Sequence, residues 1–253
     1  MKIKVLGASG SGASGYKSSA FLVDGFLLLD AGTAGELSAR EEDSLRCVLV
    51  SHAHLDHVKG LPFLMESRVG RETDPITLMG GKEIIGDIRK HIFNNRIWPD
   101  FSKIPSAKAP VFRYKALNTS RVFKLDGYTI AMERVNHTVP AHGYIIEGPA
   151  KKALAYTGDT GPTERFWKRM EEFDVRALVT EASFPNRLEG LALSSGHLTP
   201  ALLEKEIRKL SRMPETIYVM HIKPRFAREV RAEIRALGRK NLRIIESGEQ
   251  FRL

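Results

Sequence analysis

The sequence is poor in cysteine and has no long apolar segment. Its 253 residues include one cysteine, Cys47, so no internal disulfide bond can form. Cys47 lies in a short apolar run, where we expect a small buried residue with no catalytic or metal-binding role. The opening residues 1–7 form too short an apolar run for a signal peptide, and no later stretch is long enough to cross a bilayer. We therefore expect a cytoplasmic protein with no membrane partner.

Acidic residues are scarce in one part of the chain. The whole sequence has 39 Lys and Arg against 30 Asp and Glu, a net charge of +9, and 42% of it is hydrophobic. Between Arg89 and Lys124 nine basic residues face a single acidic residue, Asp100, which gives that segment a net charge of +8. This excess indicates an anionic partner without identifying it. The length and hydrophobic fraction predict one α/β domain over residues 1–253.

The most informative stretch, residues 51–57, contains three histidines and an aspartate. Burying such groups is costly unless something pairs with them, and a metal ion is a common partner. A short apolar run directly before the motif predicts a buried strand. Side chains two apart in an extended segment point the same way, so we expect His52 and His54 to hold one ion while Asp56 and His57 face a second. The alternative is a solvated polar turn, which the His-x-His-x-Asp-His spacing disfavours.

The motif and three later segments resemble those of the metallo-β-lactamase-fold hydrolases. The later segments are Asn136-His137-Thr138, Thr157-Gly158-Asp159-Thr160 and Met220-His221-Ile222, each after an apolar run. The resemblance implies an αββα sandwich, with two mixed β-sheets flanked by helices. It also implies two metal ions held by seven side chains: His52, His54 and His137 on the first, Asp56, His57 and His221 on the second, and Asp159 between both.

Two divalent ions would supply the central chemistry. Imidazole and carboxylate ligands suit Zn²⁺, and Mn²⁺ or Fe also fit these ligand types. A pair about 3.5–4 Å apart shares a water and lowers its pKa from about 15.7 to about 7, which provides hydroxide at neutral pH. We count Asp56 as catalytic as well as a ligand.

His197 is predicted to be a proton donor. It precedes Thr199-Pro200, a predicted helix start, where free backbone N–H groups favour a phosphate. An imidazole with a pKa near 6.5 can protonate an alkoxide leaving group, and Glu181 could orient it. The alternative is a solvated loop histidine. For His142 we predict a ring at the edge of the site with no role in the chemistry.

Three stretches are similar to motifs of the class II cyclic-nucleotide phosphodiesterases: residues 51–60, 196–200 and 221–224. They imply hydrolysis of 3′,5′-cyclic nucleotides (cAMP or cGMP) to 5′-nucleotides. Residues 61–63 depart from that family's signature, however, and Arg225-Phe226 is similar to the end of the ribonuclease Z motif. Cleavage of precursor tRNA, with RNA as the partner, is therefore the alternative. A non-catalytic binding module would not need the full ligand set, and a lactonase or thioesterase would not need His197.

The segment from Asn94 to Ile104 has no helical or strand period and is predicted to be a lid over the metals. We expect Arg96 to face phosphate and Trp98 or Phe101 to stack on a base. Thr199 is a further expected substrate contact. The same aromatic residues would also suit a homodimer interface.

The rest of the chain predicts alternating elements. A glycine-rich stretch, residues 7–15, contains G-x-G-x-x-G, but no helix is predicted after it, so we expect a flexible loop at the rim of the site. A hairpin turning at Asp24-Gly25 follows. Helices are predicted at residues 60–65, 81–93, 163–172, 201–211 and 226–237, and strands at 3–6, 46–50, 111–116, 122–125, 128–135, 143–147, 152–156, 176–181, 217–220 and 242–245.

Overall fold

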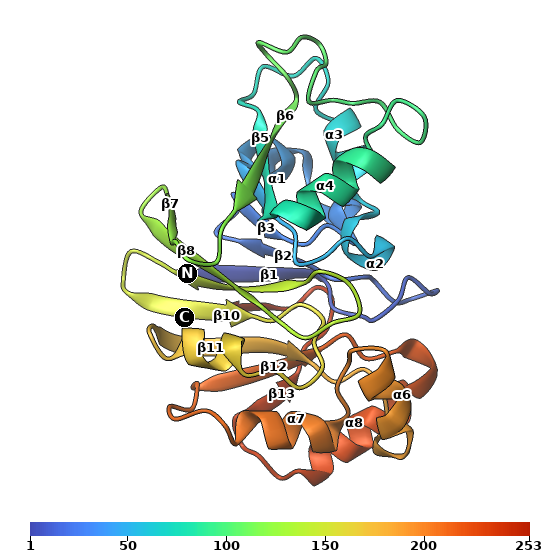
Figure 1. The fold of residues 1–253 in the computed structure, drawn as a ribbon, viewed down its shortest axis with the longest axis vertical. Helices are drawn as coiled ribbons and strands as arrows, with labels where there is room; N and C mark the ends of the chain where they lie inside the picture. Colours follow the sequence, from blue (N-terminus) through green and yellow to red (C-terminus); the bar gives the residue numbers. More distant parts are fainter.

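Two mixed β-sheets lie face to face in a computed structural model that describes all residues from 1 to 253 (Figure 1). The first sheet has the order β14-β1-β2-β3-β4-β5-β6 and the second the order β13-β12-β11-β10-β9-β8-β7. The first contains β1 (Lys2–Gly7), β2 (Ala20–Val23), β3 (Leu27–Leu29), β4 (Cys47–Leu49), β5 (Ile76–Gly81), β6 (Phe112–Leu117) and β14 (Gln250–Arg252). The second contains β7 (Phe123–Leu125), β8 (Tyr128–Arg134), β9 (His142–Glu147), β10 (Lys152–Tyr156), β11 (Asp174–Glu181), β12 (Thr216–Met220) and β13 (Leu242–Ile244).

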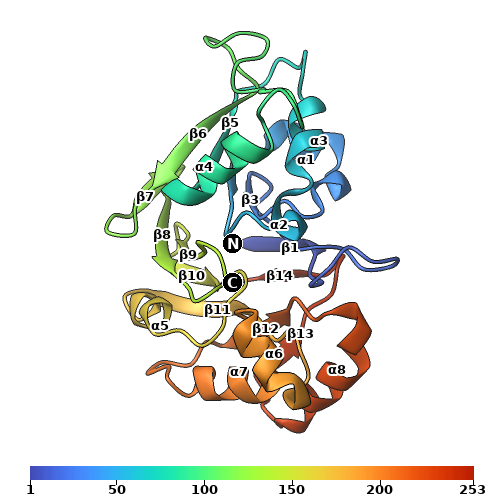
Figure 2. The same ribbon diagram turned by 45° about the vertical axis from the view of Figure 1, so that its right-hand side comes forward.

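Helices cover the outer face of each sheet, as the two views show (Figure 2). Beside the first sheet lie α1 (Ala39–Ser44), α2 (Leu55–Val58), α3 (Leu61–Glu66) and α4 (Lys82–His91). Beside the second lie α5 (Arg165–Met170), α6 (Glu189–Ser194), α7 (Pro200–Ile207) and α8 (Ala227–Ala236). This is the αββα sandwich expected from the sequence. No helix is long and apolar enough to cross a membrane.

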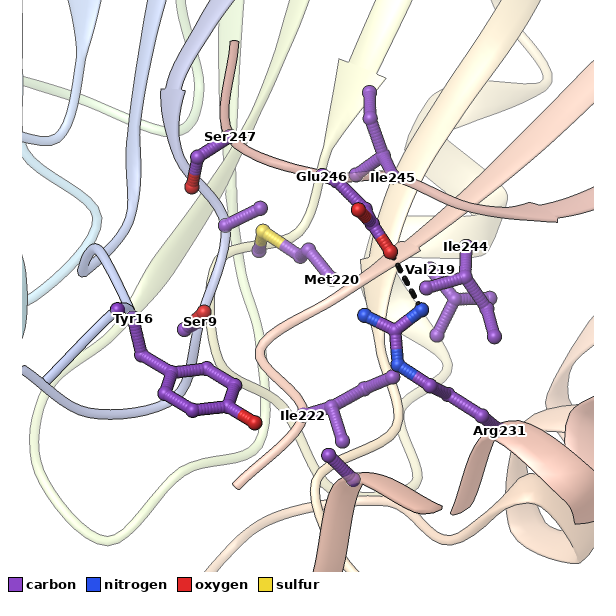
Figure 3. A pocket seen from close by; sticks show the side chains of 13 residues that line it. Ser9, Tyr16, Val219, Met220, Ile222, Arg231, Ile244, Ile245, Glu246 and Ser247 are labelled. Atoms are coloured by element: carbon purple, nitrogen blue, oxygen red, sulfur yellow. Dashed lines mark hydrogen bonds and ion pairs between the residues drawn. The ribbon is translucent and has the colours of Figure 1, made fainter. Parts of the chain in front are cut away.

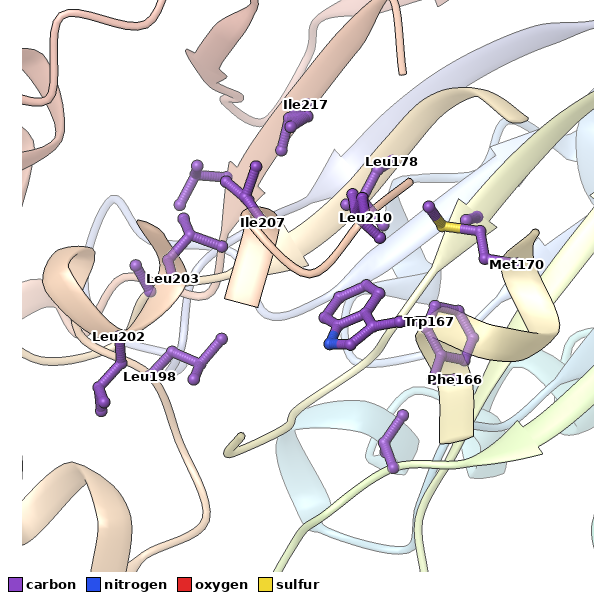
Figure 4. Packing of buried hydrophobic residues seen from close by; sticks show 14 of the residues in the cluster. Phe166, Trp167, Met170, Leu178, Leu198, Leu202, Leu203, Ile207, Leu210 and Ile217 are labelled. Carbon is purple, nitrogen blue, oxygen red and sulfur yellow. The ribbon is translucent and has the colours of Figure 1, made fainter. Parts of the chain in front are cut away.

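The apolar core has three parts. One cluster fills the space between the two sheets and includes the buried rings of Tyr144 and Tyr156. A second packs the first sheet against α3 and α4, and a third packs the second sheet against α5, α7 and α8. In the third, the Trp167 ring lies among aliphatic side chains (Figure 4), and its indole N–H donates to the buried Glu206 at 2.8 Å. The single-domain organisation stays a prediction.

Most predicted elements are present. The hairpin turns at Asp24-Gly25, with Val23 paired to Leu27, and no helix follows the glycine-rich stretch. Five elements were not predicted from the sequence: α1, α2, β5, α6 and β14. A signal for α1 was available, because Ser38 and Glu41 form a capping box at its start. The edge strand β14 has no apolar run of its own and is defined by antiparallel pairing with β1, which brings the two ends of the chain together (Figure 1).

Candidate metal centre

The seven predicted ligands converge from four parts of the chain. His52 and His54 follow β4, and Asp56 and His57 lie on the short helix α2. The other three follow strands of the second sheet: His137 comes after β8, Asp159 after β10 and His221 after β12. The expectation that these residues follow strand ends is confirmed.

The side chains form the two expected groups. In the first, ligand atoms of His52, His54 and His137 lie within 4.8 Å of one another, and in the second those of Asp56, His57 and His221 do. Asp159 lies between the groups. Its carboxylate is 3.2 Å from His57 Nε2, 3.2 Å from His221 Nε2 and 3.7 Å from His52 Nε2. The structure thus brings together the whole predicted set, while the role of each residue as a metal ligand stays a prediction.

The arrangement of atoms fits a pair of cations. Nε2 of His52 is buried and has no hydrogen-bond partner. Ring nitrogens face each other at 3.2 Å between His137 Nε2 and His54 Nδ1, and at 3.4 Å between His57 Nε2 and His221 Nε2. Polar atoms buried in this way are costly without a partner, and imidazole nitrogen with carboxylate oxygen is a donor set typical of zinc.

The electrostatics of the site also favour positive charge. Burial lowers the pKa of His52, His54 and His137, so these rings are neutral and able to donate a lone pair. Burial alone would lower the pKa of His57 too, but the carboxylates of Asp159 and Asp30 raise it well above its ordinary value. The carboxylates around His57 therefore favour a positive charge at this part of the site, and a bound divalent cation would supply it.

Asp30, which the sequence analysis did not single out, orients the motif from behind. Its buried carboxylate accepts hydrogen bonds from the Ser51 N–H at 2.7 Å, the Ser51 hydroxyl at 2.7 Å and the Tyr156 hydroxyl at 2.6 Å. His57 Nδ1 lies 2.7 Å from the same carboxylate. Donation from Nδ1 to Asp30 leaves Nε2 of His57 directed into the site, as expected for a metal ligand.

Two further contacts fix ligand rings in the same way. His137 Nδ1 donates to the Gly196 carbonyl at 2.8 Å. Ser183 Oγ lies 2.6 Å from Glu181 and 3.0 Å from His221 Nδ1, so a hydroxyl that donates to Glu181 can accept the Nδ1 proton of His221. Both arrangements leave Nε2 facing the centre.

Close approach of the chain at Gly158 positions Asp159. Gly158 has φ of +63°, and a Cβ atom there would lie 2.7 Å from Ser51 Cβ. Both the backbone conformation and the space therefore require glycine. The Thr157-Gly158-Asp159 turn can thus bring its carboxylate against the histidines of the first motif.

The predicted pair of His197 and Glu181 is in contact. His197 Nδ1 lies 2.7 Å from Glu181 Oε1, and His197 is 6% exposed, so it is not a solvated loop histidine. Burial alone would lower the pKa of His197, but the Glu181 carboxylate raises it above the ordinary value. The His197 ring stacks on His221 with centroids 5.4 Å apart and lies 5.1 Å from His137. An imidazole paired with a carboxylate therefore stands beside both groups of ligands.

Two of the predicted substrate-contact residues have side chains that are buried and already engaged. Phe101 is 6% exposed and packs in the core between the first sheet and its helices, so its ring offers no free face to a base. The Thr199 side chain is fully buried and caps α7 by accepting from the Leu202 N–H at 3.2 Å. Both expectations are corrected, because apolar packing and helix capping occupy these side chains.

The other two residues of the predicted lid lie nearer the surface. Arg96 is exposed, and half-buried Trp98 contacts Phe63 with ring centroids 5.2 Å apart. Phe63 and Ile97 are 62% and 68% exposed. This apolar surface suits the inner face of a lid or a subunit interface, and both stay predictions. His142, expected at the edge of the site, is buried outside both ligand groups, and burial lowers its pKa to about 4.

The sequence matches a known protein family over most of its length. Residues 25–222 match the family described as Beta-lactamase superfamily domain. A probable 3′,5′-cyclic-nucleotide phosphodiesterase of Yersinia pestis is 28% identical over 207 residues, which cover 72% of this chain and 58% of that protein. A ribonuclease Z of Staphylococcus epidermidis is 30% identical over 141 residues, covering 52% of this chain and 43% of that protein. The matches thus span about half the length of these curated relatives.

Solved structures share the whole fold. Unliganded yeast PDE1 superposes with a TM-score of 0.82 at 20% identity, covering 100% of this chain and 99% of that chain. The short form of human tRNase Z superposes with a TM-score of 0.72 at 18% identity, with coverage of 100% and 99%. This chain therefore shares its fold with both proteins.

Replacing Asp30 tests its role as the support of His57. Asp30→Asn removes one of the two acceptor oxygens, so His57 loses its fixed orientation, and we expect zinc affinity to fall about 10–100-fold. Competition with a chromophoric chelator measures this change, and circular dichroism of the metal-free variant checks that the fold is kept. Asp126→Asn, at a surface ion pair with Arg46, is the matched control. Unchanged affinity in Asp30→Asn would contradict the assignment.

Proposed function

Because the chain belongs to the beta-lactamase superfamily, we propose that it is a metal-dependent phosphodiester hydrolase that opens 3′,5′-cyclic nucleotides to 5′-nucleotides. The observation that carries this proposal is the ion pair of His197 and Glu181, 2.7 Å long, beside the seven-ligand cluster. A metal site alone would serve many hydrolyses. A buried imidazole paired with a carboxylate next to it suits a reaction whose leaving group is an alkoxide, because it can supply a proton.

The cluster would hold two divalent ions. We propose His52, His54 and His137 for one ion, Asp56, His57 and His221 for the other, and Asp159 for both. Zinc fits this mixture of imidazole and carboxylate best, and Mn²⁺ or Fe also fit. When bound, such a pair lowers the pKa of a water and offsets the negative charge of a phosphodiester.

His197, oriented by Glu181, would donate a proton to the leaving group. Glu181 accepts the Nδ1 proton of His197, and the Thr160 N–H at 2.9 Å holds the same carboxylate oxygen. The imidazole therefore keeps a fixed orientation, and in its cationic form it carries a second proton on Nε2. As water adds to phosphorus and the P–O3′ bond breaks, that proton passes to O3′ and gives the free ribose hydroxyl.

Asp56 is proposed to act on the attacking side. It is the most open carboxylate of the cluster, with its side chain 25% exposed against 2% for Asp159. Its Oδ2 lies 3.3 Å from His221 Nε2. The His57 and His221 rings lower the pKa of Asp56, although burial opposes this, so the carboxylate is ionised and can take a proton from the attacking water.

Cleavage of precursor tRNA is the second candidate. The exposed basic residues Arg113 and Lys115 on β6 favour it, since the edge strand of the first sheet offers a surface to an RNA backbone. They stand singly along a strand rather than in a dense run, and this spacing favours the smaller substrate.

A substrate panel separates the two functions. We expect the zinc-loaded protein to hydrolyse cAMP or cGMP with a KM that changes little between about 50 and 200 mM salt, because one phosphate contacts a few groups in a sheltered site. Binding of precursor tRNA through six to ten phosphates would instead weaken by about 10³–10⁵-fold over this range. Cleavage of precursor tRNA with that salt dependence, and of neither cyclic nucleotide, would overturn the proposal.

Removing the proton donor should affect substrates according to their leaving group. For His197→Ala we expect kcat on a cyclic nucleotide to fall about 10²–10⁴-fold, with the metal content unchanged. A bis(nitrophenyl) phosphate should lose much less, because nitrophenolate leaves without a proton. His91→Ala, at an exposed histidine on α4, is the control. Equal losses on both substrates would contradict the role.

The pH profile tests the Glu181 contact. His197 must be protonated, so kcat should decline as pH rises through its raised pKa. Glu181→Gln removes the negative charge that raises this pKa, so the alkaline decline should begin at lower pH than in the unmodified protein. Glu171→Gln, at an exposed glutamate after α5, should leave the profile unchanged. A profile unmoved by Glu181→Gln would rule out His197 as the titrating acid.

A further inference from the structure

A cavity of about 370 Å³ lies behind the candidate metal centre. Its walls come from the glycine-rich loop, the end of β12, the start of α8 and the chain after β13 (Figure 3). His221 directs its ring to the metal ligands, while its neighbours Met220 and Ile222 line this cavity. The cavity is therefore separate from the proposed catalytic site and is divided from it by one segment of backbone.

Eight of the thirteen lining residues are hydrophobic, and the polar ones include Ser9, Ser247 and one pair of charges. Val219, Ile222 and Ile244 form aliphatic walls, and Arg231 and Glu246 face each other with 2.6 Å between Nη1 and Oε1 (Figure 3). The Tyr16 ring stands on the opposite side. An apolar hollow with a few polar groups is the usual character of a small-molecule site, and 370 Å³ falls within the usual range of about 300–1,000 Å³.

The Arg231–Glu246 pair can be opened at little cost. The two side chains are 33% and 57% exposed, and exposed ion pairs contribute little to stability. A guanidinium is also well suited to bind a carboxylate, sulfonate or phosphate through two parallel N–H groups. An incoming anion can therefore replace Glu246 on Arg231.

The wall formed by the glycine-rich loop is already in place. His221 N–H donates to the Ala8 carbonyl at 2.7 Å, and the Lys223 ammonium donates to the Gly10 carbonyl at 2.9 Å. A Cβ atom on Gly10 would lie 2.4 Å from the His221 carbonyl oxygen, so glycine permits this close approach. The part of the wall formed by residues 8–10 is thus preformed.

We propose that this cavity is a second binding site, for a small molecule with a flat apolar body and a single anionic group. The apolar body lies against Ile222 and Ile244, and the anion binds Arg231 in place of Glu246.

Anilinonaphthalene sulfonate is a suitable probe, because it combines flat apolar rings with one sulfonate and fluoresces when its rings leave water. We expect the zinc-loaded full chain to bind one probe molecule. Arg231→Gln should weaken binding about 10–100-fold through loss of a charged hydrogen bond. Glu246→Gln should tighten binding, because it frees the guanidinium. Arg235→Gln, one turn along α8 and exposed, should bind like the unmodified protein.

The opposite effects expected for Arg231 and Glu246 keep the test decisive. Ala227→Trp should block the cavity, but the paired polar variants still test the proposal if that variant fails to fold. Unaltered binding in Arg231→Gln would overturn the proposal. Probe binding that requires zinc would also overturn it, because the probe would then lie on the metals. Loss of probe binding in Phe63→Ser would overturn it as well, because the probe would then lie on the exposed apolar surface at Phe63 and Ile97.

Discussion

Seven imidazole and carboxylate groups packed together, four of them buried, are the constraint on which the rest of this structure depends. Nitrogens of neighbouring rings face each other at 3.2–3.4 Å, and Asp159 lies between the two groups of ligands. Such an arrangement is costly in a protein interior unless cations hold it together. The ligands stand on loops at strand ends, and the core between the two sheets determines how closely those loops meet.

Orientation of the rings comes from a layer of hydrogen bonds behind them. Asp30, the Gly196 carbonyl and Ser183 each contact the outward nitrogen of one histidine, which fixes the inward one. Glu181 connects this layer to His197, the proposed proton donor, because the Ser183 hydroxyl and His197 both contact its carboxylate. One carboxylate therefore positions both the His197 ring and, through Ser183, the His221 ring.

The residues that come together at the candidate metal centre could be predicted from the sequence because their signals are local. The spacing from His52 to His57 specifies which side chains face together, and strand ends indicate where the others come from. The supporting roles of Asp30 and Ser183 were not predicted, because their partners are distant in sequence. Asp30 contacts His57, 27 residues away, and Ser183 contacts His221, 38 residues away. Thr199 and Phe101 were assigned to substrate binding because their side-chain types suit it. The sequence alone does not show that the Thr199 hydroxyl caps a helix or that the Phe101 ring packs in the core.

The most direct test of the account is anomalous diffraction at the zinc absorption edge from crystals of the zinc-loaded protein. We predict two peaks, one among His52, His54 and His137 and one among Asp56, His57 and His221, with Asp159 between them. A single peak, or none, in crystals of protein that keeps full hydrolytic activity would contradict it.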